Sequence, residues 1–252
     1  MFQVSAYQPI ALVTFDLYDT LVEAKPPRWE RFAIAAGRAG LEATAEQFKV
    51  ADHEAEDFYT VENGGIPIRD RSAEEQEEFR LAYTAVMLRG AGQPHDPVTS
   101  ERVRAIYRGE LDAFGWNYRV FNDVEPALSK LADAGVQRAI ISNADADVTA
   151  FCLHLGFAKH IDLIVTSALV GWEKPDPRTY HAALDPLGVD ASAAIHIGDQ
   201  ALSDVVGAEG VGAALIDRYE RQVGRKTEAI RVGSLEELTD LVIAHNAQFA
   251  VR

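Results

Sequence analysis

Ala11-Leu12-Val13-Thr14-Phe15-Asp16-Leu17-Tyr18-Asp19-Thr20-Leu21 is the stretch that decides the fold. A short apolar run rich in β-forming residues leads into Asp16, and turn-forming residues follow. This pattern predicts a buried strand that delivers a carboxylate to the edge of a sheet. Because an ionised carboxylate is costly to desolvate without a cation or hydrogen-bond donors, we expect partners for Asp16 elsewhere in the chain.

Three later segments supply candidate partners. Residues 139–143 (Ala-Ile-Ile-Ser-Asn) and 194–199 (Ala-Ile-His-Ile-Gly-Asp) are apolar runs that end in polar side chains. Between them, Lys174 stands just before a helix start marked by Pro175 and Pro177. Ligands of open α/β sheets bind outside the carboxyl ends of the strands, so we expect these tips to meet in one crevice.

Alternating strand and helix signals fill the chain after residue 120. A helix is expected to start at Asp123, strands are expected at 161–166 and 213–217 with a shorter edge strand at 230–232, and a helix at 234–245 closes the chain. This alternation predicts an α/β fold with a doubly wound parallel sheet. His196 lies inside one of the predicted strands but is not aimed at its tip, which favours a hydrogen-bonded core histidine.

The segment from about residue 23 to 118 lacks strand signals. Helical patterns cover residues 29–39, 45–59, 73–88 and 100–113, with loops expected at 63–67 and 90–95. We therefore expect two domains: an α/β core formed by residues 1–23 and 119–252, and a smaller helical domain formed by residues 24–118.

The order Asp16, then Ser142-Asn143, then Lys174, then Asp199 followed by Asp204 resembles the haloacid dehalogenase-like (HAD) hydrolase superfamily. The resemblance covers about the first two dozen residues and everything after roughly residue 120. It implies a Rossmann-like core, and the inserted helical segment resembles the α-helical cap of the superfamily, which selects substrates.

Each motif residue receives an expected role from this resemblance. Asp16 attacks phosphorus to form an aspartyl-phosphate that water hydrolyses, and Lys174 restrains Asp16 and the transferring group. The candidate substrate contacts are Ser142, Asn143 and Tyr18. The implied metal is Mg²⁺, with Asp16, the Tyr18 carbonyl, Asp199 and Asp204 as its candidate site. The charge balance supports a metal, because three carboxylates around the single cation Lys174 leave an excess of negative charge that a dication would neutralise.

Tyr18 is a departure from the pattern of the superfamily's phosphatases. They carry a second aspartate at this position, which protonates the leaving group, and a phenol is a poor acid–base catalyst near neutral pH. Strand-like alternation points the next acid, Asp19, away from Asp16. A phosphatase of this kind is expected to be slow, or to act on acyl or aryl phosphates whose leaving groups depart unprotonated.

Two alternatives stay open. Tyrosine at this position resembles the 2-haloacid dehalogenases of the superfamily, in which the aspartate attacks carbon and no metal is used. Their substrates need a cationic anchor, for which Arg28 and Arg31 are the nearest candidates, although both are more readily explained as solvated helix residues. Against this alternative, Asp199 would repel a carboxylate substrate and a departing halide. The other alternative is a weakly active or inactive binding protein.

Composition narrows the partners. The formal net charge of −15, from 24 Lys and Arg against 39 Asp and Glu, disfavours nucleic acid and anionic membranes as partners. The small-molecule substrate that we expect is what the resemblance to the superfamily implies. The single cysteine, Cys152, precludes an internal disulfide and is expected to be a core thiol. With no signal-peptide pattern at the N-terminus, we expect a cytoplasmic enzyme. The sequence leaves the substrate and the oligomeric state open.

Overall fold

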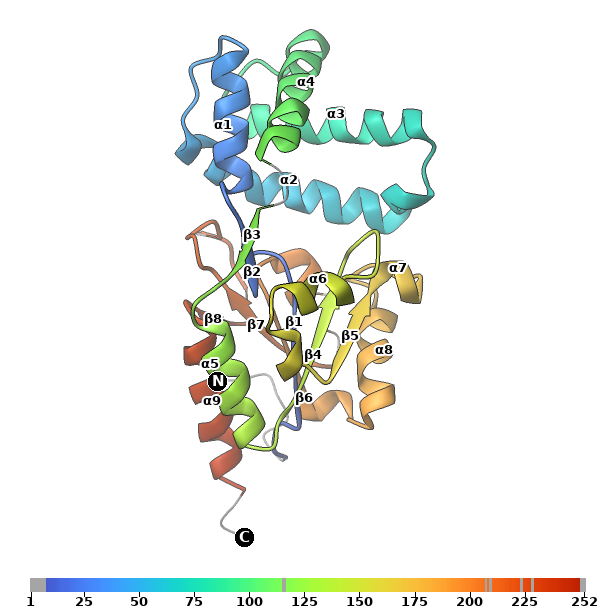
Figure 1. The fold of residues 1–252 in the computed structure, drawn as a ribbon, viewed down its shortest axis with the longest axis vertical. Helices are drawn as coiled ribbons and strands as arrows, with labels where there is room; N and C mark the ends of the chain where they lie inside the picture. Colours follow the sequence, from blue (N-terminus) through green and yellow to red (C-terminus); the bar gives the residue numbers. More distant parts are fainter. Residues whose placement is uncertain are drawn as a thin grey trace. The chain divides into compact units, whose positions relative to one another are not determined.

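The computed structural model describes residues 8–114, 117–206, 208, 210–222, 224–227 and 229–249. The chain divides into two compact units (Figure 1), one formed by Met1–Glu23 with Val120–Arg252 and the other by Ala24–Arg119. We refer to them as the sheet unit and the helical unit. No helix in the described ranges is long and apolar enough to cross a bilayer.

A six-stranded sheet in the order β5-β4-β1-β6-β7-β8 forms the centre of the sheet unit. Every pair of neighbouring strands is parallel. The strands are β1 (Leu12–Phe15), β4 (Gln137–Ser142), β5 (Leu163–Thr166), β6 (Ala194–Gly198), β7 (Gly212–Ile216) and β8 (Ile230–Val232). The predicted α/β fold with a parallel sheet is therefore confirmed. Because β1 pairs with both β4 and β6, the carboxyl ends of the three motif-bearing strands lie side by side.

Both faces of the central strands are buried. Leu12, Ala139, Ile141 and Ala194 share one apolar cluster with Tyr180, Ala183 and Leu184 of α8 (Pro177–Leu187). Side chains alternate along a strand, so the intervening residues Val13, Ile140 and Ile195, which are also fully buried, face the opposite side. Burial on both faces explains why these strands are nearly continuous apolar runs.

Helices flank the parallel strands: most lie in the connections between strands, and the last helix follows β8. They are α5 (Val124–Asp133), α6 (Thr149–His154), α7 (Ser167–Val170), α8 and α9 (Leu235–Ala247), with 3₁₀ turns at Ala158–His160 and Ala191–Ala193 and a π-helix at Ala201–Val206. α5 and α9 pack side by side (Figure 1). The predicted start of α8 is confirmed, because Asp176 caps the helix and Pro177 occupies its first turn.

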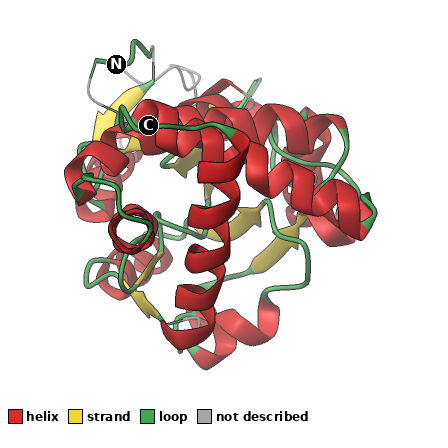
Figure 2. Ribbon diagram, turned by 90° about the horizontal axis from the view of Figure 1, so that it is seen from above, coloured by secondary structure: helices red, strands yellow, loops and turns green. Residues whose placement is uncertain are grey.

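The helical unit consists of α1 (Arg28–Arg38), α2 (Ala45–Gly65), α3 (Ala73–Gly90) and α4 (Pro97–Phe114), with a 3₁₀ turn at Ile68–Asp70 (Figure 1). Figure 2 shows the chain from above with its helices in red. Reciprocal capping boxes start α2, at Thr44 and Gln47, and α3, at Ser72 and Glu75. The prediction of a loop at residues 63–67 is wrong at its first half. α2 continues through the glycine pair and ends at Gly65, two residues before Pro67, which is a stronger helix breaker than glycine.

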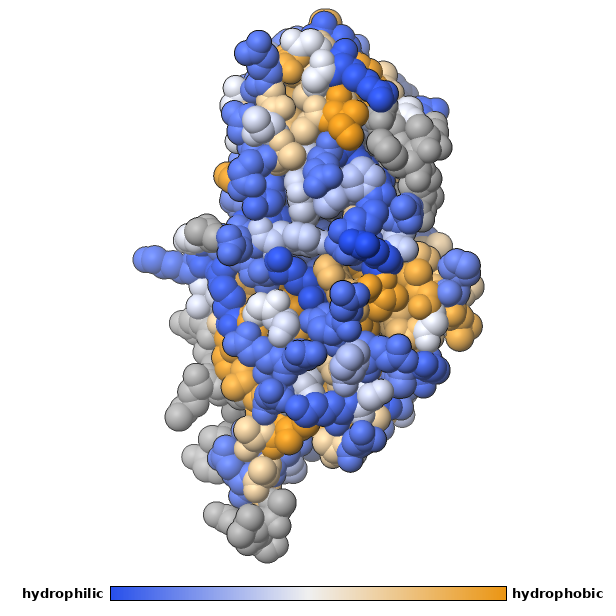
Figure 3. All heavy atoms as spheres, turned by 60° about the vertical axis from the view of Figure 1, so that its left-hand side comes forward, coloured by the Kyte–Doolittle hydropathy of each residue, from blue (hydrophilic) through white to orange (hydrophobic). Residues whose placement is uncertain are grey.

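Two short strands, β2 (Val22–Ala24) and β3 (Tyr118–Val120), pair with each other where the chain passes between the units. Neither of these strands was predicted from the sequence. On the face of the molecule shown in Figure 3, hydrophilic residues predominate and are interrupted by apolar patches.

Candidate active site

Asp16 follows directly after β1 at the carboxyl edge of the sheet. Its backbone N–H donates to the carbonyl of Ile197 in β6 at 2.8 Å, so the neighbouring strand fixes its position. The side chain is only 12 % exposed. Burial raises the pKa of Asp16 to about 7, against the opposing effect of the Lys174 ammonium. Asp16 is thus a carboxylate whose ionisation near neutral pH depends on nearby positive charge.

Lys174 supplies part of that charge. Its Nζ lies 2.7 Å from Oδ1 of Asp16 and 2.7 Å from Oδ1 of Asp204, and the residue is 1 % exposed. Burial alone would lower the pKa of Lys174, but the two carboxylates outweigh it and the pKa is raised. The structure therefore joins three residues from three motifs through one ammonium group.

Asn143 holds the backbone of Lys174 in place. Its Nδ2 donates to the Lys174 carbonyl at 2.9 Å and its Oδ1 accepts from the Lys174 N–H at 2.7 Å. Ser142, at the end of β4, is fully buried, and its hydroxyl has no hydrogen-bond partner among the described residues. The Asn143 amide is thus used to position Lys174, whereas the Ser142 hydroxyl retains its capacity to donate.

Asp204 reaches the site because a π-helix starts two residues after Asp199. Its Oδ1 accepts from Lys174 and its Oδ2 accepts from the backbone N–H of Gln200 at 2.9 Å. Burial would raise the pKa of Asp204, but the Lys174 charge lowers it below the usual value. Since both oxygens are engaged, the geometry favours an orienting role over direct metal ligation. A Cβ at Gly198 would overlap this carboxylate, which explains the glycine in the motif.

His196 is the buried core histidine that the sequence predicted. Its Nδ1 lies 2.9 Å from the Thr14 hydroxyl, and its Nε2 lies 3.3 Å from Oδ1 of Asp204. Burial lowers the pKa of His196, so the imidazole is neutral at physiological pH. It therefore adds hydrogen bonding to Asp204 without adding charge.

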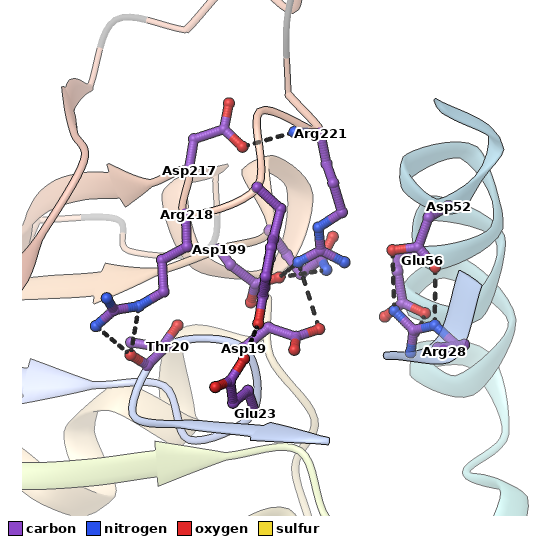
Figure 4. Close-up of polar contacts among 12 residues, drawn as sticks. Asp19, Thr20, Glu23, Arg28, Asp52, Glu56, Asp199, Asp217, Arg218 and Arg221 are labelled. Carbon is purple, nitrogen blue, oxygen red and sulfur yellow. Dashed lines mark hydrogen bonds and ion pairs between the residues drawn. The ribbon is translucent and has the colours of Figure 1, made fainter. Parts of the chain in front are cut away.

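Asp199 faces inward and is paired with a second cation, Arg221, from the loop after β7 (Figure 4). The Arg221 side chain is 3 % exposed. The same loop supplies Gln222, whose Nε2 donates to the Asp199 carbonyl at 3.0 Å. The expectation of Lys174 as the single cation is therefore wrong. The sequence did carry a signal, because the predicted strand at 213–217 also ends at this edge and charged residues follow it.

Asp19 is also turned toward this second cation. Its φ of 58° lies in the left-handed region, which breaks the alternation that sequence analysis assumed. Asp19 Oδ2 consequently lies 3.4 Å from Arg221. Tyr18 is partly buried, and its ring lies 6.2 Å from that of Phe151 in α6. The loop after β1 thus contributes a carboxylate to the Asp199 side of the site.

The chemistry of these side chains fits Mg²⁺. The described residues contain no cluster of three or more His, Cys, Asp or Glu arranged as a ready-made metal cage. Mg²⁺ commonly takes only one or two carboxylates and completes its shell with water and phosphate. Four carboxylates and two cations, counted as ionised, leave an excess of two negative charges. One magnesium ion carries the matching charge.

Arg31 in the helical unit is buried, so its interpretation as a solvated helix residue is wrong, whereas Arg28 is partly exposed and ion-paired. Arg28 pairs with the fully buried Asp52 at 2.8 Å and with Glu56 at 2.9 Å (Figure 4). Arg31 is 3 % exposed and donates to the backbone carbonyl of Pro26 at 2.8 Å. Both guanidinium groups are therefore engaged within the helical unit.

A parallel sheet with an aspartate after its first strand, a lysine–aspartate pair and a second aspartate at the same edge defines a hydrolase of the HAD type. The family model for haloacid dehalogenase-like hydrolase matches residues 10–212, and the chain belongs to this family.

Similar proteins agree with the assignment to this family. Haloacid dehalogenase-like hydrolase domain-containing protein 3 of Mus musculus is 29 % identical over 204 residues, which cover 80 % of this chain and 78 % of that protein. Ribulose-1,5-bisphosphate 5-phosphatase of Halopiger xanaduensis is 27 % identical over 247 residues, which cover 91 % of this chain and 98 % of that protein. A 2-haloacid dehalogenase from Pseudomonas syringae, known from a crystal structure, is 28 % identical in sequence. The match covers 93 % of this chain and 98 % of that chain, with a TM-score of 0.52.

Proposed function

We propose that this hydrolase is a magnesium-dependent phosphatase of a small phosphorylated metabolite, acting through an aspartyl-phosphate on Asp16. The observation that carries the proposal is the Lys174 ammonium, held 2.7 Å from Asp16 and 2.7 Å from Asp204 beside an inward-facing Asp199. This arrangement concentrates negative charge around one attacking oxygen. A dication and a phosphoryl group suit such a site better than a carboxylate substrate does.

In the proposed reaction an Asp16 oxygen forms a bond to phosphorus while the bond from phosphorus to the leaving oxygen breaks. Water then cleaves the acyl phosphate and restores the Asp16 carboxylate. Lys174 and the Ser142 hydroxyl bind the phosphoryl oxygens, and Asn143 keeps Lys174 in position. Asp16, the Tyr18 carbonyl and Asp199 would hold Mg²⁺, which supplies positive charge for phosphate binding and for ionisation of Asp16.

Two observations favour phosphorus over carbon as the reacting atom. The Halopiger relative, which aligns over nearly its whole length, is named a sugar-bisphosphate phosphatase. In addition, the described candidates for anchoring a carboxylate substrate, Arg28 and Arg31, are engaged in the helical unit. A sugar phosphate is therefore the first substrate class to test.

Tyr18 gives the proposal a kinetic signature. Because the phenol is a poor general acid near neutral pH, the leaving oxygen departs with little help. We expect rates to fall steeply as the leaving group becomes more basic, so aryl and acyl phosphates are hydrolysed faster than alkyl phosphates. A shallow dependence would show that another group donates the proton.

The decisive experiment measures hydrolysis of p-nitrophenyl phosphate and of a sugar-phosphate panel with Mg²⁺ and with chelator. The Asp16→Asn variant serves as the control, because it keeps the size of the side chain and removes the nucleophile. We expect activity that needs both Mg²⁺ and Asp16. Activity that survives either loss would contradict metal-assisted covalent catalysis.

A 2-haloacid dehalogenase is the second candidate. It is favoured by Tyr18 and by the similarity to the Pseudomonas syringae enzyme. Chloride release from 2-chloropropionate, independent of Mg²⁺ and abolished in Asp16→Asn, would establish it in place of the phosphatase. A chain active in neither assay would belong to the third class, a binding protein.

A further inference from the structure

Arg221 is the cation that sequence analysis did not anticipate, and its surroundings are specific. The guanidinium group contacts Oδ2 of Asp199 and lies 3.4 Å from Oδ2 of Asp19 (Figure 4). Its own backbone N–H donates to Oδ1 of Asp217 at 2.8 Å, which fixes the loop that carries it. The main chain of Arg221 is therefore held by Asp217 and its side chain by Asp199.

Asp199 is also one of the groups that would hold Mg²⁺ in the proposed function. Its Oδ2 already accepts from Arg221 and from Nε2 of Gln200, the latter at 2.8 Å. A guanidinium group and a dication that share one carboxylate repel each other strongly in a buried site. Binding of Arg221 to Asp199 therefore disfavours binding of the metal to Asp199, and binding of the metal disfavours binding of Arg221.

Asp19 gives Arg221 a second place to bind. The left-handed turn at Asp19 brings its carboxylate within 3.4 Å of the guanidinium, and the Tyr219 ring lies 5.8 Å from the guanidinium carbon. Arg221 can thus release Asp199 and still keep a counter-ion, the partly exposed carboxylate of Asp19. The exchange leaves neither carboxylate without a positive partner.

We propose that Arg221 is an internal counter-ion that competes with Mg²⁺ for Asp199, so that metal binds by taking Asp199 over while Arg221 stays with Asp19. This inference rests on the proposed metal-dependent function. Arg221 is a positioning residue in it, since it acts through Asp199. Its presence weakens metal affinity and keeps Asp199 in its inward orientation when no metal is bound.

The test is a metal-binding measurement that needs no turnover. Mn²⁺ binding is followed by electron paramagnetic resonance, and Mg²⁺ binding by calorimetry, on the wild type, Arg221→Gln and Arg218→Gln. Arg218→Gln is the matched control because it removes the same charge from the same loop, whereas Arg218 contacts Asp123 and the Thr20 carbonyl. We expect Arg221→Gln to lower the metal Kd about tenfold or more and Arg218→Gln to change it less than about twofold.

The outcomes separate the inference from the function on which it rests. Wild-type binding with an unchanged or higher Kd in Arg221→Gln overturns the competition and leaves the metal site standing. No metal binding to any of the three proteins overturns the metal dependence and the inference together.

A second readout guards against a variant that does not fold. The Nε–H signal of Arg221 in ¹⁵N-labelled wild type, identified by its absence in Arg221→Lys, is expected to shift as Mg²⁺ is added. A signal that does not move at saturating Mg²⁺ would contradict the exchange.

Discussion

The Lys174 ammonium lies 2.7 Å from Oδ1 of Asp204, a carboxylate that is itself fully buried. Lys174→Met would leave Asp16 and Asp204 without their shared cation. Because an unpaired buried charge is costly, we expect the free energy of unfolding, measured in urea, to fall by about 3–5 kcal/mol. The double variant Lys174→Met/Asp204→Asn should regain part of this stability but no activity. A single variant as stable as wild type would show that the ion pair is not needed for folding.

Gly198→Ala should be among the most damaging small substitutions. The added methyl would overlap the Asp204 carboxylate, which is held by Lys174 and by the Gln200 N–H. We expect a loss of about 3 kcal/mol or more in unfolding free energy and a loss of activity. Gly37→Ala is the matched control, because Gly37 lies in α1 with nothing near its missing Cβ. It should raise stability by about 0.5–1 kcal/mol.

Asn143→Ala should act on catalysis through Lys174. The variant loses two hydrogen bonds to the Lys174 backbone, so we expect about 1–3 kcal/mol less stability and a kcat that falls more than KM changes. Asn143→Asp keeps the acceptor for the Lys174 N–H but loses the donor to the Lys174 carbonyl. Its stability and kcat should therefore lie between those of the wild type and those of Asn143→Ala. Equal changes in substrate affinity and kcat would instead indicate that the amide contacts substrate.

Arg28→Met tests whether this arginine is structural. Asp52 is fully buried and Arg28 is its counter-ion, so the variant should lose about 3–5 kcal/mol of unfolding free energy. Adding Asp52→Asn should restore part of the loss, since the amide needs no cation. Unchanged stability together with lost halide release would instead identify Arg28 as the anchor of a carboxylate substrate.

Cys152 provides a pH-dependent prediction away from the site. The thiol is fully buried, and burial raises its pKa from about 9 to about 12. Between these values the unfolded chain loses the thiol proton before the folded protein does, so the stability contributed by Cys152 falls as pH rises. The difference in unfolding free energy between wild type and Cys152→Ala should be constant below about pH 8.5 and should shrink above it. A difference that grows with pH would contradict this assignment.

Much of the fold could be predicted because burial on both faces leaves a strong mark on the sequence. The apolar runs ending in Asp16, Ser142 and Asp199 gave the strands β1, β4 and β6 and the edge of the sheet at which they end. Lys174 was identified by resemblance to the family's motif order, and the structure brings it to Asp16 and Asp204.

The second cation of the site could not be predicted in the same way. Arg221 belongs to a loop without a periodic pattern, and its pairing depends on where that loop folds back. Asp19 was misplaced because a single left-handed residue reverses the direction of a side chain and leaves no trace in composition. The length of α2 was underestimated because glycines were given more weight than the proline that ends the helix.

The paired strands β2 and β3 have an evolutionary consequence. They bring the start and the end of the helical segment together, and the Lys25 N–H donates to the Asn117 carbonyl at 2.7 Å. A segment whose ends are hydrogen-bonded neighbours can be shortened, exchanged or replaced by a tight turn without rethreading the six-stranded sheet. The helical unit can thus be exchanged between relatives as one piece while the strand order of the sheet unit is kept.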